Sequence, residues 1–314
     1  MNAPTVDAAA TLDTSLEERI RSMRTGFQGL FYPAPADLDD EQKAHWLLTR
    51  SAELGATALQ LFALPADRDA RLRLAERARE LDIELEGYAP AMFVPLGEDP
   101  ETTTEELRAQ LIAAREAGMT VVRSGYGRLT LETSKFARER NLQQQLDHVA
   151  ACLRRAGRVA EEVGIPVAVE NHCDFTGREL AGVLAEVGSE WVGCALDTAN
   201  GFTVYCDPND DVEALAEYTF TTHIKDMQMV QSPITWFIPM LPKGCKLGEG
   251  HVDIPRAVQL LAERSPRAER LHLLVEPGWE SFGQPGERDP DELKKEIIEH
   301  GVAYLNSLIA TSSR

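Results

Sequence analysis

PVAVENH (166–172), VGCALDTAN (192–200) and TFTTHIKD (219–226) are three short apolar runs, and each ends abruptly in charged or polar side chains. Segments with a helical pattern, 177–187 and 211–218, separate the runs. Strands that alternate with helices of this length predict βαβ units and a parallel sheet. In such sheets ligands bind at the carboxyl ends of the strands, so a functional site is expected where these runs end.

The same alternation extends over the rest of the chain. Strands are predicted at 26–32, 58–64, 83–91, 121–127 and 271–277, and helices at 40–54, 67–81, 101–117, 134–163, 255–263 and 289–308. A helix at 13–24 precedes the first strand, residues 1–12 are expected to form a flexible tail, and a long connection covers 228–252. No change in composition divides the chain, so residues 1–314 are predicted to form one (β/α)8 TIM barrel. A doubly wound open sheet is the alternative, but no glycine-rich phosphate fingerprint follows the first strand.

The composition is that of an acidic protein with enough residues for a large core. The chain has 51 Asp and Glu against 32 Lys and Arg, a formal net charge of −19. An acidic surface repels phosphate backbones and anionic lipids, so nucleic acid and membranes are poor partners. The five cysteines match no CxxC motif, residues 1–20 contain acids and no apolar signal segment, and no apolar run approaches the length of a membrane span. We therefore expect a cytoplasmic protein with free thiols.

Strand phase brings four ligand-type residues to one end of the predicted barrel, because side chains alternate between the two faces of a strand. Glu170 shares its strand face with Ala168, and Asp197, His223 and Glu276 end the next three strands. If these faces point inward, three carboxylates and one imidazole meet at the mouth. Such a set suits Mn²⁺ or Mg²⁺, with Co²⁺ or Zn²⁺ as alternatives. Three carboxylates buried together without a cation would be very costly, since like charges at short range cannot all stay ionised.

Each of these residues, taken alone, has a structural alternative. A single Glu, Asp or His at a strand end serves about as often as a helix cap or a satisfied polar group. The metal hypothesis rests on four such residues at consecutive strand ends. Other histidines are weaker candidates: His45, His148 and His300 fall on predicted helices and are expected to be structural or exposed. His272 falls in the middle of a strand and is expected to be a core histidine.

The ordered segments VAVENH (167–172), ALDTANG (195–201), THIKD (222–226), LGEGHVDIP (247–255) and LLVEP (273–277) resemble the sugar phosphate isomerase/epimerase superfamily, the xylose isomerase-like TIM barrels. The resemblance is clearest over 120–278. It implies one divalent metal held by Glu170, Asp197, His223 and Glu276. In the ketose 3-epimerase and hydroxypyruvate isomerase branches, the residues that match Glu170 and Glu276 also move protons, one on each face of the substrate. The resemblance thus implies proton removal beside a metal-bound carbonyl, with isomerisation or epimerisation of a small sugar as the default outcome.

Because the sequence departs from the epimerase pattern, a lyase activity is an alternative. In those epimerases a substrate-contacting histidine follows the strand-six aspartate by three residues, where this chain has Asn200. HIKD (223–226) is more similar to inosose dehydratases and related lyases, and C-glycoside deglycosidase subunits and keto-sugar-acid decarboxylases also resemble this barrel. His172, two residues beyond Glu170, is then a candidate additional acid or base. A non-catalytic sugar-binding subunit is a further alternative, against which the intact ligand quartet argues. Seven histidines and the net charge of −19 argue against the apurinic-site endonuclease branch, which binds three metals and DNA.

A further group of residues is expected to contact the substrate. These residues are Arg123, Asn200, Lys225 and Trp236. Lys225 shares the face of His223, and its alternative is an ion pair with Asp226 or with a barrel carboxylate. Arg123, at the end of the fourth strand, binds a substrate oxygen or pairs with a neighbouring acid. Trp236 lies in the long seventh connection, which is expected to be a lid over the site, with local packing or an oligomer contact as the alternative. Both a homo-oligomer and a small partner subunit are left open.

Overall fold

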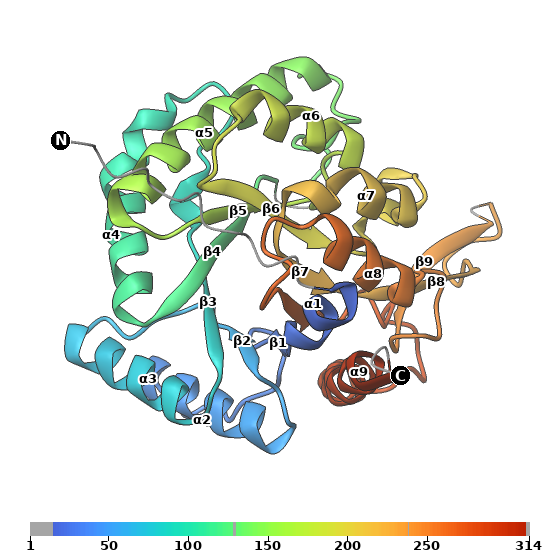
Figure 1. Cartoon of the computed structure of the whole chain (residues 1–314). Helices are drawn as coiled ribbons and strands as arrows, with labels where there is room; N and C mark the ends of the chain where they lie inside the picture. The colour runs from blue at the N-terminus through green and yellow to red at the C-terminus, as the bar shows by residue number, and fades with distance from the viewer. Residues whose placement is uncertain (1–14, 128–129, 238, 312–314) are drawn as a thin grey trace.

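Parallel strands close into a barrel, and helices surround it on the outside (Figure 1). The structure is a computed structural model that describes residues 15–127, 130–237 and 239–311. In these residues the closed barrel has eight strands, in the spatial order β1–β2–β3–β4–β5–β6–β7–β10. Their bounds are β1 (Arg24–Gln28), β2 (Ala58–Gln60), β3 (Glu84–Tyr88), β4 (Met119–Gly125), β5 (Val167–Glu170), β6 (Val192–Asp197), β7 (Thr219–Ile224) and β10 (His272–Val275). The predicted (β/α)8 TIM barrel is confirmed.

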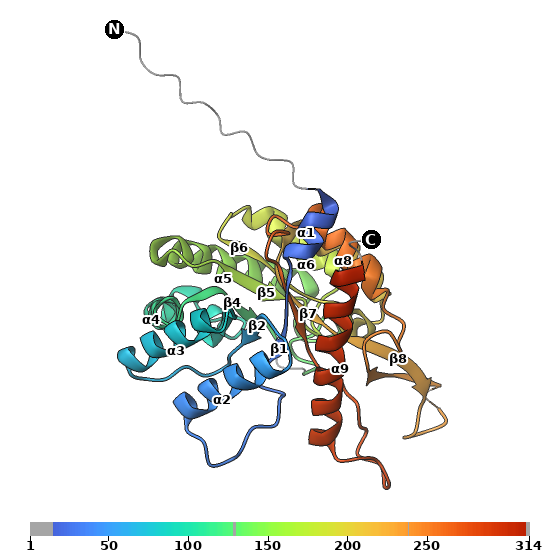
Figure 2. The same ribbon diagram turned by 60° about the horizontal axis from the view of Figure 1, so that its bottom comes forward.

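The helices cover the outer surface of the barrel. They are α1 (Leu16–Ser22), α2 (Asp40–Glu53), α3 (Arg68–Glu80), α4 (Thr104–Glu116), α5 (Leu142–Val163), α6 (Gly177–Val187), α7 (Pro208–Leu215), α8 (Ile254–Arg264) and α9 (Pro290–Thr311). Helix α1 corresponds to the helix expected at 13–24 and lies beside α8 and α9 (Figure 2). The expected tail, residues 1–12, lies outside the described residues. In the part of the chain that the structure describes, no helix is long and apolar enough to cross a membrane.

Helix α5 begins at Leu142, so the predicted start at residue 134 is wrong. Asn141 accepts a hydrogen bond from the Gln144 backbone N–H at 2.8 Å, and the Gln144 side chain accepts one from the Asn141 N–H at 3.3 Å. This reciprocal capping box satisfies N–H groups that have no partner inside the helix. The apolar periodicity upstream of Asn141 therefore does not extend the helix. At the other end Gly164 adopts the left-handed conformation (φ 77°) that ends α5, as expected for a glycine.

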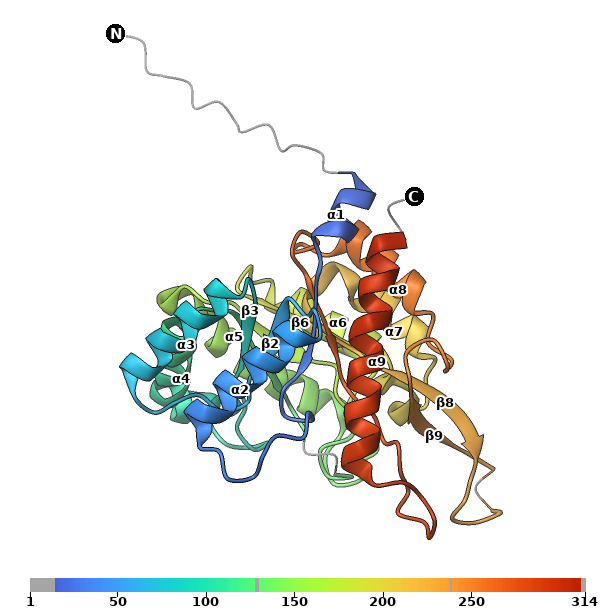
Figure 3. The ribbon, with the colours of Figure 1, turned by 90° about the horizontal axis from the view of Figure 1, so that it is seen from below.

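The long seventh connection contains an antiparallel hairpin, which the sequence analysis did not predict. Strands β8 (Asp226–Gln231) and β9 (Met240–Cys245) pair from Asp226↔Cys245 to Gln231↔Met240. The hairpin projects from the barrel (Figure 3). Its base is fixed by the Asp226 carboxylate, which accepts hydrogen bonds from the backbone N–H groups of Gly248, Gly250 and Val252 at 2.9–3.1 Å. Asp226 thus holds the connection together and leaves Lys225 free to turn into the barrel.

The barrel interior contains small side chains below the predicted site. Ala168 and Ala195 form a buried cluster with Val121 and Phe220. The alternate residues, such as Val167 on β5, belong instead to the larger core between strands and helices. The strand phase used to place Glu170 above Ala168 therefore holds, because the two faces of β5 lie in different cores.

Close strand packing gives a testable consequence at Gly26 of β1. A methyl group added there would fall on the carbonyl oxygen of Ala58 in β2, and a backbone atom cannot rotate away. We expect Gly26→Ala to lower the free energy of unfolding by about 3 kcal/mol or more. Gly182→Ala is the control, because a Cβ on this exposed glycine of α6 meets no heavy atom of the described residues within 4 Å. It should raise helix stability by roughly 0.5–1 kcal/mol. Urea unfolding of both variants measures the difference, and equal midpoints would contradict the prediction.

Candidate metal centre

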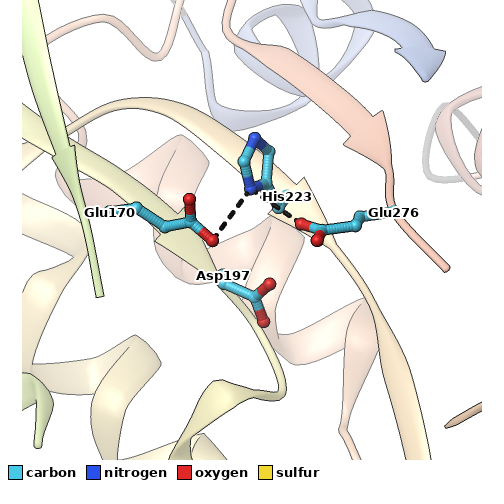
Figure 4. A group of neighbouring side chains, drawn as sticks. All are labelled: Glu170, Asp197, His223 and Glu276. Atoms are coloured by element: carbon cyan, nitrogen blue, oxygen red, sulfur yellow. Dashed lines mark ion pairs between the residues drawn. The ribbon is translucent and has the colours of Figure 1, made fainter. Parts of the chain in front are cut away.

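Four side chains converge at the carboxyl-end mouth of the barrel (Figure 4). Glu170 ends β5, Asp197 ends β6, His223 lies near the end of β7, and Glu276 directly follows β10. One ligand atom from each lies within 4.8 Å of the others. Asp197 and His223 are fully buried, and Glu170 and Glu276 are nearly so. The structure therefore brings together all four of the residues that strand phase selected.

The geometry around His223 fits a metal ligand. Its Nδ1 atom lies 2.8 Å from Glu276 Oε2 and 3.3 Å from Glu170 Oε1. Among the described residues Nδ1 nevertheless has no partner with hydrogen-bond geometry. A buried polar atom without a partner costs free energy, and a cation between these atoms would use the imidazole nitrogen as a ligand. Carboxylate oxygens with one imidazole suit a hard divalent cation such as Mg²⁺ or Mn²⁺.

Lys225 reaches into the same site from the residue after β7. Its ammonium lies 2.9 Å from Asp197 Oδ2 and 3.3 Å from Glu276 Oε1, and it donates to Asn200 Oδ1 at 3.3 Å. Lys225 therefore forms an ion pair with barrel carboxylates and not with Asp226. Asn200 is also part of the site, since its amide lies 3.4 Å from Glu170 Oε1. The substrate contacts expected of Lys225 and Asn200 stay predictions.

Burial and charge act in opposite directions on the acids of the site. Burial raises the pKa of Asp197 to about 6 even though Lys225 opposes the shift. Burial also disfavours the charged form of Glu276, but Lys225 and His223 outweigh it and lower its pKa to about 2. For His223, burial favours the neutral ring, yet Glu170 and Glu276 raise its pKa to about 9. The site thus stabilises ionised glutamates by surrounding them with positive charge.

Arg123 supports Glu170 from the neighbouring strand β4. Its Nη1 donates to Glu170 Oε2 at 2.7 Å, and its guanidinium carbon lies 4.8 Å and 5.2 Å from the ring centroids of Phe62 and Tyr88. Burial disfavours the ionised form of Glu170, but Arg123 and His223 hold its pKa well below the usual value. Arg123 therefore pairs with a neighbouring acid, one of its two expected roles. Its contact with substrate stays a prediction.

Asn171 and Trp279 are residues that sequence reasoning did not select. The Asn171 side chain donates to the Asp197 carbonyl at 2.9 Å and accepts from the Asp197 N–H at 2.6 Å, which fixes the end of β6. The Trp279 ring centroid lies 5.7 Å from the Lys225 ammonium, and the side chain is half-exposed. Its position three residues after Glu276, just beyond a strand end, was the available signal.

His172 and Trp236 lie outside the quartet. His172 follows the end of β5, its side chain is 23% exposed, and its Nδ1 lies 3.9 Å from Asp174 Oδ2, too far for a hydrogen bond. Trp236 lies in the turn of the projecting hairpin, is 79% exposed and stacks on Phe237 with ring centroids 3.9 Å apart. The structure therefore does not bring Trp236 to the mouth, and both predicted roles stay predictions.

Comparison with known proteins agrees with the barrel fold. A family model described as the xylose isomerase-like TIM barrel matches residues 48–308. The chain belongs to this family. It is 24% identical over 263 residues to a 3-oxo-isoapionate decarboxylase of Pectobacterium atrosepticum, which covers 82% of this chain and 86% of the relative.

Solved structures share the fold of this xylose isomerase-like barrel. A Mycobacterium smegmatis protein of the same description, in complex with magnesium, superposes with a TM-score of 0.68 at 15% identity, covering 94% of this chain and 99% of that one. A D-psicose 3-epimerase with D-tagatose from Clostridium cellulolyticum H10 also gives 0.68, at 13% identity, covering 91% and 99%. At these identities the likeness concerns the fold.

The quartet predicts that metal binding depends on Asp197 and His223. Asp197→Ala and His223→Ala each remove a ligand, so both should lose the near-stoichiometric Mn²⁺ that the wild type retains after loading and dialysis. Removal of a metal ligand commonly costs more than the 10–100-fold loss in affinity seen for outer residues. His148→Ala is the control, because it removes another buried imidazole, which contacts the Val94 carbonyl at 2.9 Å. Elemental analysis of the three variants decides, and full occupancy in both ligand variants would rule out the quartet.

Proposed function

We propose that this protein is a divalent-metal-dependent enzyme of small sugars or keto sugars. One observation carries the proposal: Glu170, Asp197, His223 and Glu276 each present a ligand atom within 4.8 Å of the others. These residues would hold the cation, and a bound divalent cation polarises a substrate carbonyl and lowers the pKa of the neighbouring C–H bond. The named decarboxylase and epimerase support a carbohydrate-modifying enzyme, and the magnesium in the related structure supports a divalent cation.

Isomerisation or epimerisation is the first candidate reaction, and two opposed carboxylates favour it. Glu170 and Glu276 lie on either side of His223 (Figure 4). In an epimerisation one glutamate carboxylate removes a proton from carbon, and the other glutamate, in its protonated carboxylic-acid form, returns a proton to the opposite face. The neighbouring cations lower the pKa of both glutamates, so the glutamate that removes the proton is ionised, while the one that returns a proton must first take one up from solvent.

Decarboxylation of a keto-sugar acid is the second candidate, and Lys225 favours it. Its buried ammonium beside Asp197 and Glu276 offers a counter-charge to a substrate carboxylate. The C–C bond to the carboxylate breaks, carbon dioxide leaves, and the electron pair passes to the polarised carbonyl as an enolate. A proton then adds to carbon, and His172 is the candidate donor. The decarboxylase relative, similar over most of both chains, supports this reaction.

Other features of the function stay predictions. They include the cytoplasmic location and assembly with a second copy or with a small partner subunit.

Incubation in D₂O separates the two reactions. The Mn²⁺-loaded protein is tested against a panel of ketoses and keto-sugar acids, and products are followed by NMR and mass spectrometry. An epimerase or isomerase returns a sugar of unchanged composition with deuterium at the reacting carbon, because the abstracted proton exchanges with solvent. A decarboxylase releases carbon dioxide and leaves one deuterium where the carboxylate was. His172→Ala should slow only the second reaction. A metal-loaded protein that does neither with any member of the panel would contradict the proposed function.

Glu276→Gln tests the proton-moving role directly. The amide oxygen still serves as a ligand but cannot take a proton, so turnover should fall by at least ~10²-fold while part of the metal is retained. Glu287→Gln is the control, since Glu287 follows the same strand but bonds Ser281 and Gln284 in the next turn. A Glu276→Gln enzyme with full metal and wild-type turnover would leave Glu276 as a ligand only.

We expect substitution of Trp279 and substitution of Trp236 to affect substrate binding differently. Trp279 lies beside Lys225 at the mouth, so Trp279→Ala should raise KM roughly fivefold, the effect of losing one stacking contact of about 1 kcal/mol. Trp236→Ala tests the lid hypothesis and should raise KM with unchanged metal content if the hairpin closes over the site. Steady-state kinetics and gel filtration of both variants provide the measurement. Dissociation of an oligomer by Trp236→Ala would instead make the hairpin a contact between subunits.

A further inference from the structure

Polar side chains fill the part of the barrel mouth that carries no quartet residue. Gln28 ends β1, Gln60 ends β2, Glu86 lies in β3 and Arg123 in β4. All four are at most 7% exposed. TIM-barrel interiors are normally filled by branched apolar residues, so a continuous polar layer on four adjacent strands requires a reason.

Arg123 is the meeting point of this layer. Its Nε donates to Gln60 Oε1 at 3.2 Å, its Nη2 to Gln28 Oε1 at 3.4 Å, and its Nη1 to Glu170 Oε2 at 2.7 Å. The guanidinium is planar and cannot rotate one donor without moving the others. The position of the Glu170 carboxylate therefore depends on two glutamine side chains that do not touch it.

The orientation of each glutamine amide is fixed by a carboxylate on its other side. Gln28 Nε2 donates to Glu276 Oε2 at 2.6 Å, and Gln60 Nε2 donates to Glu86 Oε2 at 3.0 Å. A carboxylate only accepts hydrogen bonds, so each NH₂ group must face its acid and each carbonyl must face Arg123. We name this pair, Gln28 and Gln60, the amide belt.

Gln60 is anchored inside the barrel through its acceptor, Glu86. Glu86 Oε1 lies 2.6 Å from His272 Nδ1 and accepts a hydrogen bond from the Thr221 hydroxyl. His272 is in turn 2.7 Å from Glu84. His272 is thus a core histidine, as the sequence suggested, and it holds the acceptor that orients Gln60. Gln28 differs from Gln60, because it donates its hydrogen bond directly to the quartet residue Glu276.

From these contacts we propose that Gln28 and Gln60 are positioning residues, which hold Glu170 and Glu276 in the arrangement that binds the metal. The inference rests on the proposed function for the identity of the ligand. Glu276, Gln28, Arg123 and Glu170 form an unbroken chain of hydrogen bonds that joins the two outer ligands of the quartet. A neutral amide suits this place: a glutamate would add another negative charge, and a lysine would compete with the metal for Glu276.

Mn²⁺ titration calorimetry on the full chain tests the belt. Residues that orient metal ligands typically contribute 10–100-fold to affinity, so Gln28→Met should weaken Mn²⁺ binding by about that factor. Gln60→Met, which acts only through Arg123, should weaken it less, by roughly threefold to tenfold. Gln145→Met is the matched control, since Gln145 is another fully buried amide but bonds the Ser134 carbonyl at 3.0 Å, in a contact with α5 outside the barrel. It should lower the melting temperature and leave Mn²⁺ affinity within twofold of the wild type.

Affinities within twofold of the wild type in both belt variants would overturn the proposal, and if Gln28→Met fails to fold, Gln60→Met decides alone. A wild type that binds no Mn²⁺ contradicts the proposed function, and the belt is then judged on a crystal structure of Gln28→Met, or of Gln60→Met if needed. Displacement of Glu276 in the first, or of Arg123 in the second, supports positioning, and unchanged side chains overturn it.

Discussion

The repulsion between Glu170, Asp197 and Glu276 is the constraint on which the mouth of this barrel depends. Two unit charges about 4 Å apart interact by ~4 kcal/mol at an effective dielectric constant of 20, so three buried carboxylates require compensation from every side. The structure supplies it with separate cations: Arg123 for Glu170, and Lys225 for Asp197 and Glu276. Each cation comes from a different strand end, which is possible because a closed parallel barrel brings all its carboxyl ends to one rim.

This constraint explains features that look unrelated along the chain. Small residues such as Ala168 and Ala195 pack in a buried cluster on the strands that carry the acids, while the opposite strands provide amides and a guanidinium. The base of the hairpin is fixed by the Asp226 carboxylate through backbone N–H groups, so the residue directly after Lys225 does not compete for its ammonium. The mouth of the barrel therefore has two different halves: one carries the candidate metal ligands, and the other carries the side chains proposed to orient them.

The quartet could be predicted from the sequence because acids and histidine at strand ends have few roles and because period-two alternation fixes their face. The same rule gave the strands but not their exact bounds: β3 ends at Tyr88, and Pro90–Met92 forms a 3₁₀ turn where a strand was expected. The start of α5 depends on a local capping competition at Asn141 that apolar periodicity does not report. The hairpin was missed because β9 contains Pro242 and Gly244, residues that disfavour a strand, although most residues of β8 and β9 are buried or half-buried.

The amide belt was missed for a different reason. Gln28 and Gln60 also end short, mostly buried strands, but glutamine is neither a strong metal ligand nor an acid or base, so it carries no chemical signal by itself. The positioning role of each glutamine depends on the charged side chains that its amide bonds on either side. Gln28 faces Glu276 and Arg123, which are far apart in sequence, and only barrel closure between β1 and β10 brings Glu276 beside it. Positioning residues of this kind depend on tertiary contacts and are visible only in the structure.

The arrangement of charge around the quartet also bears on the choice between the two proposed reactions. A C–H bond that is to be broken must point at a carboxylate, and Glu170 and Glu276 offer one on each side of His223. A substrate carboxylate would be repelled from both and attracted to the Lys225 ammonium. The substrate would present either a hydroxyl or a carboxylate to Lys225. This contact would decide whether a C–H bond or the C–C bond to the carboxylate is aligned with the polarised carbonyl. Under the proposed function the same four candidate ligands would support either reaction, and the specificity would depend on the Lys225 ammonium and the Trp279 ring beside it.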